Sequence, residues 1–304
     1  MNEIQSNSLD PEKKSVGVDR ANIPNSDEEI MTTAHTPLPD IDRYQPQTRE
    51  ELIGNYDLNK HLYNQLLALR TGRIDKGRNT LVEGGSREGK TVTIRFFARC
   101  LLCLELCMKT LNPGCGGRCE NCRMNTARYG EEGVFAQLRG HHFHFRCIDC
   151  TKIANSQQLR NEVNAMWDFN GVKVIYLDEI SRLENPNMAL TLLPPMNDLN
   201  FMWIASGISA RGLDHALVNR FSERLTTELP SLGELSEWLS KRCVAWQIDW
   251  DHENTLVRLA QRSNRIPGLA LQPLSKVNCD PQRTLTREIV ENFRFKSSGP
   301  LPNS

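Results

Sequence analysis

Gly84-Gly85-Ser86-Arg87-Glu88-Gly89-Lys90-Thr91 decides the fold, because it has the pattern G-x-x-x-x-G-K-T of a phosphate-binding loop. The residues before it, 79–83, look like a short buried strand, and an apolar helix is expected from Thr91 onward. The motif requires this order, since glycines let backbone N–H groups converge on phosphates at a helix N-terminus. A chance glycine turn is the alternative. We disfavour it because every fixed position of the pattern and both flanks agree.

The last residues of the loop indicate its chemistry. Lys90 is expected to reach the outer phosphates of a nucleoside triphosphate, and the Thr91 hydroxyl is expected to bind Mg²⁺. The nucleotide-binding residues predicted from the loop and the start of the helix are Gly84, Gly85, Ser86, Arg87, Glu88, Gly89, Lys90, Thr91 and Val92.

Composition sets outer limits. The chain has 304 residues, 39% of them apolar, so it can bury the core of one large or two small domains. Its formal net charge is zero, so composition neither supports nor excludes a nucleic-acid partner. Ten cysteines and no recognisable signal peptide indicate a reducing, cytoplasmic location, where clustered thiols more often bind metal or pack in the core. The longest apolar stretch, 92–108, contains charged residues and predicts a buried helix rather than a membrane span.

Downstream, strands and helices alternate, which predicts an α/β domain with a parallel sheet. Further strands are expected at 143–148, 172–177, 201–205 and 224–229. The third predicted strand ends in Asp178-Glu179, and carboxylates at such a strand end are typical of the second half of a phosphate-loop site. Asp178 would hold Mg²⁺ through water, and Glu179 would polarise the attacking water. A solvated turn is the alternative, which the loop upstream disfavours.

Two candidate residues and a helical unit follow. Ser206 comes directly after the fourth predicted strand, a position suited to sensing the γ-phosphate, and Arg220 lies at the end of a short helix. Ser231 has the sequence of a capping box for a helix to about Trp246. Two more helices are expected from Asp251 to 263 and over 268–277, so the C-terminal part is predicted to be a small helical unit.

A cysteine pattern after the loop's helix predicts a zinc site. Cys107, Cys115, Cys119 and Cys122 are separated by glycine- and proline-rich turns, so four thiolates can converge on a structural, tetrahedral Zn²⁺. Free buried thiols are the alternative. Cys103 is the reserve ligand should Cys107 face inward, and is otherwise expected in the core.

The order of these parts resembles that of the AAA+ ATPases, and within them the clamp-loader family that includes the gamma/tau subunits of bacterial DNA polymerase III. The resemblance covers about 41–280. Arg43-Tyr44-Gln45-Pro46-Gln47-Thr48, with Leu52-Ile53-Gly54-Asn55, is similar to that family's opening motif near the adenine, and implies base contacts from Tyr44, Pro46 and Ile53. It also implies the fold of an AAA+ P-loop NTPase: a parallel five-stranded sheet in the order 5-1-4-3-2, a zinc-binding insertion and a small helical lid domain.

The resemblance further implies the activity and the partners. Its members hydrolyse ATP with Mg²⁺ as homo- or hetero-oligomeric rings, and their trans-acting arginine corresponds to Arg220. DNA and a sliding clamp, or another replication or recombination protein, are the implied partners. An assembly module for a protein partner and a branch-migration or transposition-type ATPase remain as alternatives. The arginine that the family places near the start of its third lid helix is replaced by Ile266-Pro267-Gly268, with Arg262 and Arg265 as nearby substitutes.

These observations predict the domain organisation. Residues 1–40 are polar and acid-rich and are expected to form a disordered tail. The nucleotide-binding domain is expected over 41–229 with the zinc insertion at about 107–125. The lid domain is predicted over 230–280, and a C-terminal helix and tail over 281–304.

Overall fold

A computed structural model describes the protein over residues 45–74, 77–116, 118–119, 121–122, 141–142, 145–164, 173–183, 185–198 and 201–296. All of these residues belong to one compact unit of the chain, Leu38–Ser304. The predicted N-terminal tail and Tyr44 lie outside the described residues.

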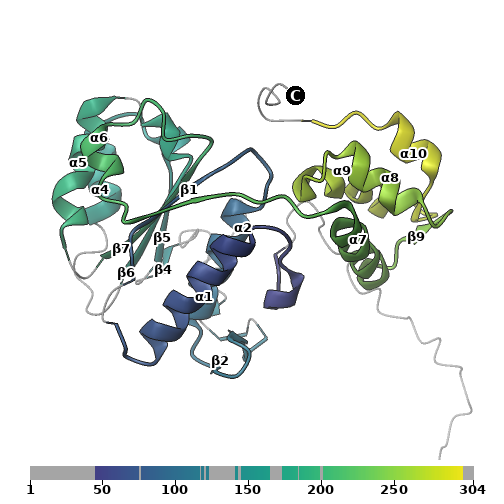
Figure 1. Ribbon diagram of the computed structural model, residues 1–304, viewed down its shortest axis with the longest axis horizontal. Coiled ribbons are helices and arrows are strands. Elements are labelled where there is room, and N and C mark those ends of the chain that lie inside the picture. Colours follow the sequence, from purple (N-terminus) through teal and green to yellow (C-terminus); the bar gives the residue numbers. More distant parts are fainter. Residues whose placement is uncertain are drawn as a thin grey trace, which may run out of the picture. The chain divides into compact units, whose positions relative to one another are not determined.

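A six-stranded sheet forms the centre of the nucleotide-binding region, in the order β4-β5-β6-β7-β1-β8 (Figure 1). Its strands are β1 (Thr80–Glu83), β4 (His141–His142), β5 (Phe145–Asp149), β6 (Lys173–Asp178), β7 (Phe201–Gly207) and β8 (Glu223–Thr226). Five of them pair in parallel, and the predicted order 5-1-4-3-2 is confirmed. The sixth, β4, was not predicted. It pairs antiparallel with β5 at the edge of the sheet.

Alternating side chains divide the core between the two faces of the sheet. On β6, Val174 and Tyr176 pack against the helices α1 (Tyr56–Arg70) and α2 (Lys90–Leu102), whereas Ile175 and Leu177 belong to the cluster on the other face. That second face is covered by α4 (Ser156–Asn164), α5 (Pro186–Met196) and α6 (His215–Val218). Because both faces are buried, the central strand β7 is buried along its whole length.

The helix α2 is shorter than its sequence predicts, and ends at Leu102 instead of continuing to residue 108. Side chains from elsewhere bind its last carbonyl oxygens. The Arg70 guanidinium donates to the oxygens of Leu101 and Cys103 at 3.3 and 3.1 Å, and the Asn121 amide donates to that of Leu102 at 2.7 Å. These contacts satisfy carbonyls that a longer helix would have used itself.

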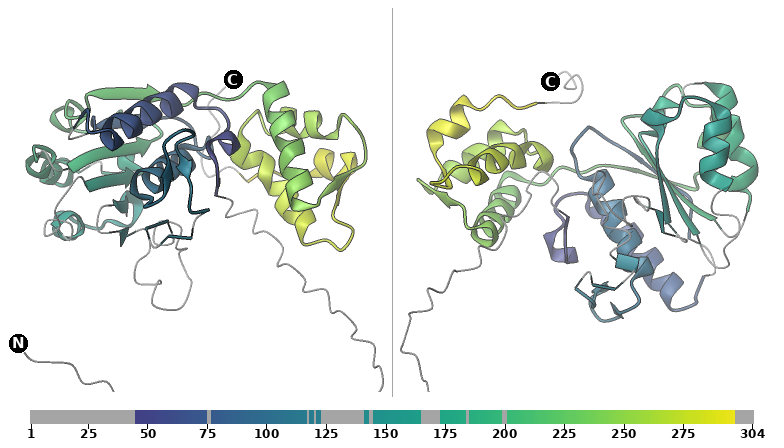
Figure 2. Two further views of the ribbon diagram at one scale, coloured as in Figure 1. Left: turned by 90° about the horizontal axis from the view of Figure 1, so that it is seen from below. Right: turned by 180° about the vertical axis from the view of Figure 1, so that it is seen from behind.

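The chain after α2 turns into a small two-stranded hairpin before it returns to the sheet (Figure 2). Its strands are β2 (Leu106–Cys107) and β3 (Asn112–Pro113), which pair antiparallel. The Arg49 backbone N–H, at the start of the short 3₁₀ helix η2 (Arg49–Glu51), donates to the Asn112 side chain at 2.8 Å. The segment before α1 is therefore tied to this hairpin.

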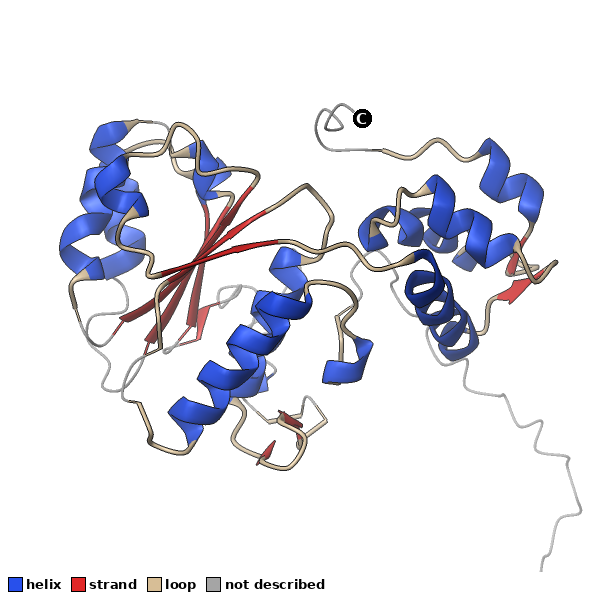
Figure 3. Ribbon diagram, viewed as in Figure 1, coloured by secondary structure: helices blue, strands red, loops and turns tan. Residues whose placement is uncertain are grey.

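A separate hydrophobic cluster holds the C-terminal helices together (Figure 3). The elements are α7 (Leu232–Trp246), β9 (Asp249–Trp250), α8 (Thr255–Arg262), α9 (Pro267–Asn278), β10 (Thr284–Leu285) and α10 (Arg287–Asn292). The capping box predicted at Ser231 is present, with Glu234 as its second member. Val290 of α10 is buried in the same cluster as Leu239 of α7. Within the part of the chain that the structure describes, no helix is long and apolar enough to span a membrane.

Candidate functional site

The phosphate-binding loop joins β1 to α2 as the motif requires. Gly89 has φ +92°, a conformation that favours glycine, and α2 begins at the next residue, Lys90. The Lys90 side chain is 5% exposed, and its Nζ donates to the carbonyl oxygens of Gly84 and Gly85 at 2.7 and 2.6 Å. Burial lowers the pKa of Lys90 from its usual value, and the nearby carboxylate of Glu179 opposes this shift. The loop thus holds a nearly buried cation beside its own backbone.

The C-terminal ends of β6 and β7 bring oxygen atoms to the start of α2. The Thr91 hydroxyl lies 3.3 Å from both carboxylate oxygens of Asp178. Ser206, which is fully buried, donates to the same carboxylate at 2.9 Å. A hydroxyl and a carboxylate are the hard oxygen donors that Mg²⁺ prefers, so Thr91 and Asp178 fit that ion.

Tyr176 is a member of this group that our sequence analysis did not select. Its hydroxyl donates to Asp178 Oδ1 at 2.7 Å, and lies 2.7 Å from the Ser206 hydroxyl and 3.2 Å from that of Thr91. Burial, and then the charge of Asp178, raise the pKa of Tyr176 well above its usual value, so the hydroxyl keeps its proton. The sequence could have indicated this position, because Tyr176 and Asp178 are two residues apart on one strand and therefore face the same side.

Glu179 follows the strand in a left-handed backbone conformation, with φ +55°. This turn separates it from Asp178. Glu179 lines the open cavity beside the loop, whereas Asp178 lies within the hydroxyl cluster at its edge. The two adjacent carboxylates therefore have different surroundings, as their different predicted roles require.

A cavity of about 350 Å³ opens along the loop and the first turn of α2. Part of its lining comes from the loop and the first turn of α2, from Ser86 to Thr93. Another part is apolar: Pro46, Leu52, Ile53, Trp238 and Leu271. Of the three residues expected to contact the base, Pro46 and Ile53 line this cavity. The Trp238 indole donates to the Glu51 carbonyl oxygen at 2.8 Å and so links the helical lid to the segment before α1.

Asn55 ties the loop to the end of the sheet, a role that its sequence position did not reveal. This residue is fully buried, and its side chain donates to the Glu88 carbonyl oxygen at 2.7 Å while accepting from the Glu228 N–H at 3.1 Å. The Glu88 carboxylate accepts from the Gly85 N–H at 2.8 Å and from the Thr227 hydroxyl. These contacts fix the shape of the loop from two sides.

Arg220 lies apart from this cavity. It follows α6, its side chain is exposed, and its carbonyl oxygen accepts from the Asn79 side chain at 3.1 Å. Arg220 is not among the described residues that line the cavity. The structure therefore leaves this arginine available at the surface.

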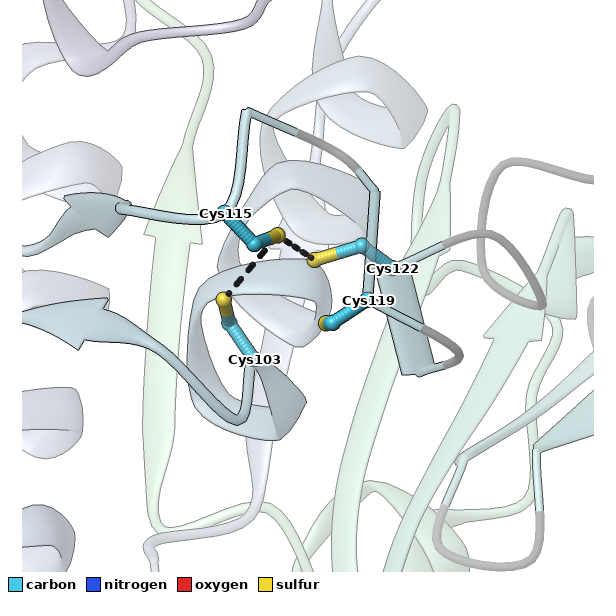
Figure 4. A group of neighbouring side chains, drawn as sticks. All are labelled: Cys103, Cys115, Cys119 and Cys122. Atoms are coloured by element: carbon cyan, nitrogen blue, oxygen red, sulfur yellow. Dashed lines mark hydrogen bonds between the residues drawn. The ribbon is translucent and has the colours of Figure 1, made fainter. Parts of the chain in front are cut away.

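A second candidate site is a group of thiols at the end of α2, with Sγ atoms that all lie within 4.8 Å of one another (Figure 4). Its members are Cys103, Cys115, Cys119 and Cys122. The Cys115 Sγ is 3.6 Å from that of Cys103 and 3.5 Å from that of Cys122. Sulfur ligands about 2.3 Å from a tetrahedral zinc lie about 3.8 Å apart, so the cluster fits that ion.

The thiol cluster differs from the predicted set in one member. Cys103, the reserve ligand, takes part, and Cys107 does not, because α2 ends early and Cys107 lies exposed on β2. Burial raises the pKa of Cys103 and of Cys122. Burial would also raise the pKa of Cys115, but hydrogen bonds from the Cys119 backbone and the neighbouring thiols outweigh it and lower this pKa to about 6. The thiolate is the form of cysteine that binds metal.

Comparison with known proteins supports the fold. No family model and no curated protein matches the sequence. Among solved structures, the RuvB Holliday junction branch migration motor of Thermotoga maritima is similar, with a TM-score of 0.56 at 16% identity over 83% of this chain and 71% of that one. This chain has the AAA+ P-loop fold. A point mutant of the same motor gives a TM-score of 0.55 at 15% identity over 81% of this chain and 71% of that one.

Proposed function

We propose that this AAA+ chain binds Mg·ATP and hydrolyses it to ADP and phosphate, and that it works as a motor or switch within an oligomer. One observation carries the proposal: a buried lysine, a hydroxyl–carboxylate pair and a separate glutamate meet beside a single cavity. Lys90 neutralises charge on the outer phosphates. Thr91 would bind Mg²⁺ through its hydroxyl, Asp178 would hold the ion through water, and Glu179 would orient water for in-line attack.

Neighbouring residues orient the Asp178 and Glu179 carboxylates for these roles. Mg²⁺, when bound, offsets the negative charge that develops on the phosphates. Tyr176 and Ser206 hold one oxygen of Asp178 in place through their hydroxyls, so the carboxylate is already oriented. Glu179 keeps its position because the backbone turns sharply after Asp178.

Arg220 is the residue we expect to act on a neighbouring subunit. Its exposure, and its absence from the described lining of its own cavity, support a role at the site of a second copy or a related subunit. Replacing Arg220 with alanine should lower ATP turnover by roughly 1,000-fold, because an arginine finger offsets charge in the transition state. Turnover per subunit should also rise with protein concentration.

The control for this prediction is Arg224→Ala, which removes an exposed arginine from β8. Phosphate release measured across a range of protein concentrations checks both variants. If specific activity is constant with concentration and Arg220→Ala behaves like Arg224→Ala, no trans-acting role exists for this residue.

Branched DNA is the substrate class we favour for the motor. The two solved structures compared above belong to a Holliday junction branch migration motor, and this likeness supports DNA translocation over clamp loading or protein assembly. A clamp-loader activity is the second candidate, favoured by the thiol cluster after α2, since the clamp-loader resemblance includes a zinc module at that point.

Mobility-shift assays with and without a non-hydrolysable ATP analogue separate these functions. Tighter ATP-dependent binding to a four-way junction than to a matched duplex is expected. A preference for primed single-stranded DNA would favour clamp loading instead. Failure to bind any of these DNAs would leave the protein-assembly module as the better account.

We also propose that the thiol cluster holds one structural Zn²⁺. The ligands would be Cys103, Cys115, Cys119 and Cys122, with no position left for water. Such an ion would supply folding energy to the segment just after α2, where the thiols and Leu106 form a small cluster among the described residues.

Metal analysis of three single variants tests the zinc proposal. Cys103→Ser should lose the metal, whereas Cys107→Ser should retain about one zinc per chain, as the wild type does. Cys100→Ser serves as a control for burial, because Cys100 is buried in α2 but lies outside the thiol cluster. All variants should still bind ATP. Equal zinc in Cys103→Ser and wild type, or a folded wild type free of zinc, would contradict the assignment.

A further inference from the structure

The first residues of the lid helix α9 touch the phosphate-binding loop directly. The Gly268 N–H donates to the Arg87 carbonyl oxygen at 3.1 Å, and the Arg87 guanidinium donates to the Gly268 carbonyl oxygen at 3.5 Å. Both residues line the cavity beside the loop. A loop residue and a lid residue are therefore joined in both directions in the lining of this cavity.

Only glycine fits at position 268 in this arrangement. A Cβ atom there would lie 2.8 Å from the Arg87 Cβ and 2.8 Å from the Arg87 carbonyl oxygen. Arg87 itself has φ +66°, a conformation that is strained for a residue with a side chain. An arginine held in a conformation suited to glycine, opposite a glycine that leaves room for it, indicates a use for the guanidinium.

The charged side chains around the cavity indicate what the Arg87 guanidinium would bind. Among the described lining residues, the cationic side chains are Arg87 and Lys90. The two arginines that the sequence offers as substitutes for the family's lid arginine are elsewhere. Arg262 pairs with the Glu291 carboxylate at 3.2 Å and donates to the Phe293 carbonyl oxygen, and Arg265 is exposed outside the described lining.

We propose that Arg87 is a second phosphate-binding cation, and that it couples the terminal phosphate of the nucleotide to the lid. This inference rests on the proposed ATP site. A triphosphate attracts the guanidinium more strongly than the neutral Gly268 carbonyl does, because the hydrogen bonds are then charge-assisted on both sides. The lid contact at Gly268 consequently differs between the ATP and ADP states. The loop thus supplies the arginine that the lid helix lacks.

Binding of ADP and of a non-hydrolysable ATP analogue, measured by calorimetry, tests this role. Arg87→Ala should weaken binding of the ATP analogue by about 10-fold while changing ADP binding by less than about 2-fold. The matched control, Arg265→Ala, should leave both affinities unchanged. Equal weakening of both nucleotides, or no change in either, would overturn the proposal. Failure of the wild type to bind either nucleotide would instead refute the ATP site itself.

Two substitutions at position 87 separate the guanidinium from the shape of the loop. Arg87→Gly, which suits the positive φ at this position, should lose the preference for the ATP analogue, whereas Arg87→Lys, which keeps a cation, should retain a preference. An Arg87→Gly variant that keeps the full preference would show that the loop backbone, and not this charge, sets it.

Discussion

Lys90→Ala should weaken Mg·ATP binding by about 2–3 kcal/mol, a factor on the order of 100, because hydrogen bonds to charged groups contribute on this scale. The Lys90 ammonium is nearly buried at the loop and already donates to two loop carbonyls, so no other side chain of the loop can take its place without rearrangement. Alanine is favourable in a helix, so α2 should still begin at this position.

Calorimetric titration with Mg·ATP measures this effect, and thermal unfolding checks that the variant remains folded. The control is Lys60→Ala, which removes an exposed lysine from α1. An affinity for Mg·ATP that is the same in Lys90→Ala and Lys60→Ala would contradict the assignment of the loop.

Glu179→Gln should retain ATP but lose turnover by roughly 100-fold or more, the usual contribution of a general base. Glutamine keeps the size of the side chain and its capacity for hydrogen bonds, but it lacks the charge that polarises water. Because Asp178 and the hydroxyls around it are unaffected, Mg²⁺ binding should persist in this variant.

Two measurements separate binding from chemistry in this variant. Nucleotide bound at equilibrium should match the wild type, while phosphate release should fall. Glu237→Gln, at an exposed position of α7, should alter neither quantity. Wild-type turnover in Glu179→Gln would exclude Glu179 as the residue that activates water.

The sequence was sufficient to predict the centre of the sheet, because β1, β6 and β7 are largely apolar runs buried on both faces. The β6 and β7 strands lie within two residues of their predicted ends. The edge strand β4 was not predicted, since it has two residues and both are histidines. Nothing in so short a polar segment signals a strand.

The thiol cluster shows where the local sequence pattern is insufficient for prediction. The apolar character of 92–108 predicted one continuous helix, which would have placed Cys103 in the core. The helix instead ends where Arg70, some thirty residues earlier in the chain, binds its last carbonyls. A helix end that is fixed by a distant side chain cannot be found from the helix's own sequence.

Contacts across long sequence separations explain the other omissions. Asn55 joins the loop to Glu228, and Gly268 packs on Arg87, although neither pair is close in sequence. The motif therefore predicted which residues form the loop, but not which distant residues fix its shape. Tyr176 was the exception, because strand alternation alone could have placed its side chain beside that of Asp178.

ATP hydrolysis by the wild-type chain, measured as phosphate release against Mg²⁺ and protein concentration, tests the central claim most directly. We expect turnover that requires Mg²⁺, increases as the protein assembles and disappears in Lys90→Ala. A folded wild type that releases no phosphate at any Mg²⁺ or protein concentration, or that releases it equally in Lys90→Ala, would contradict this account.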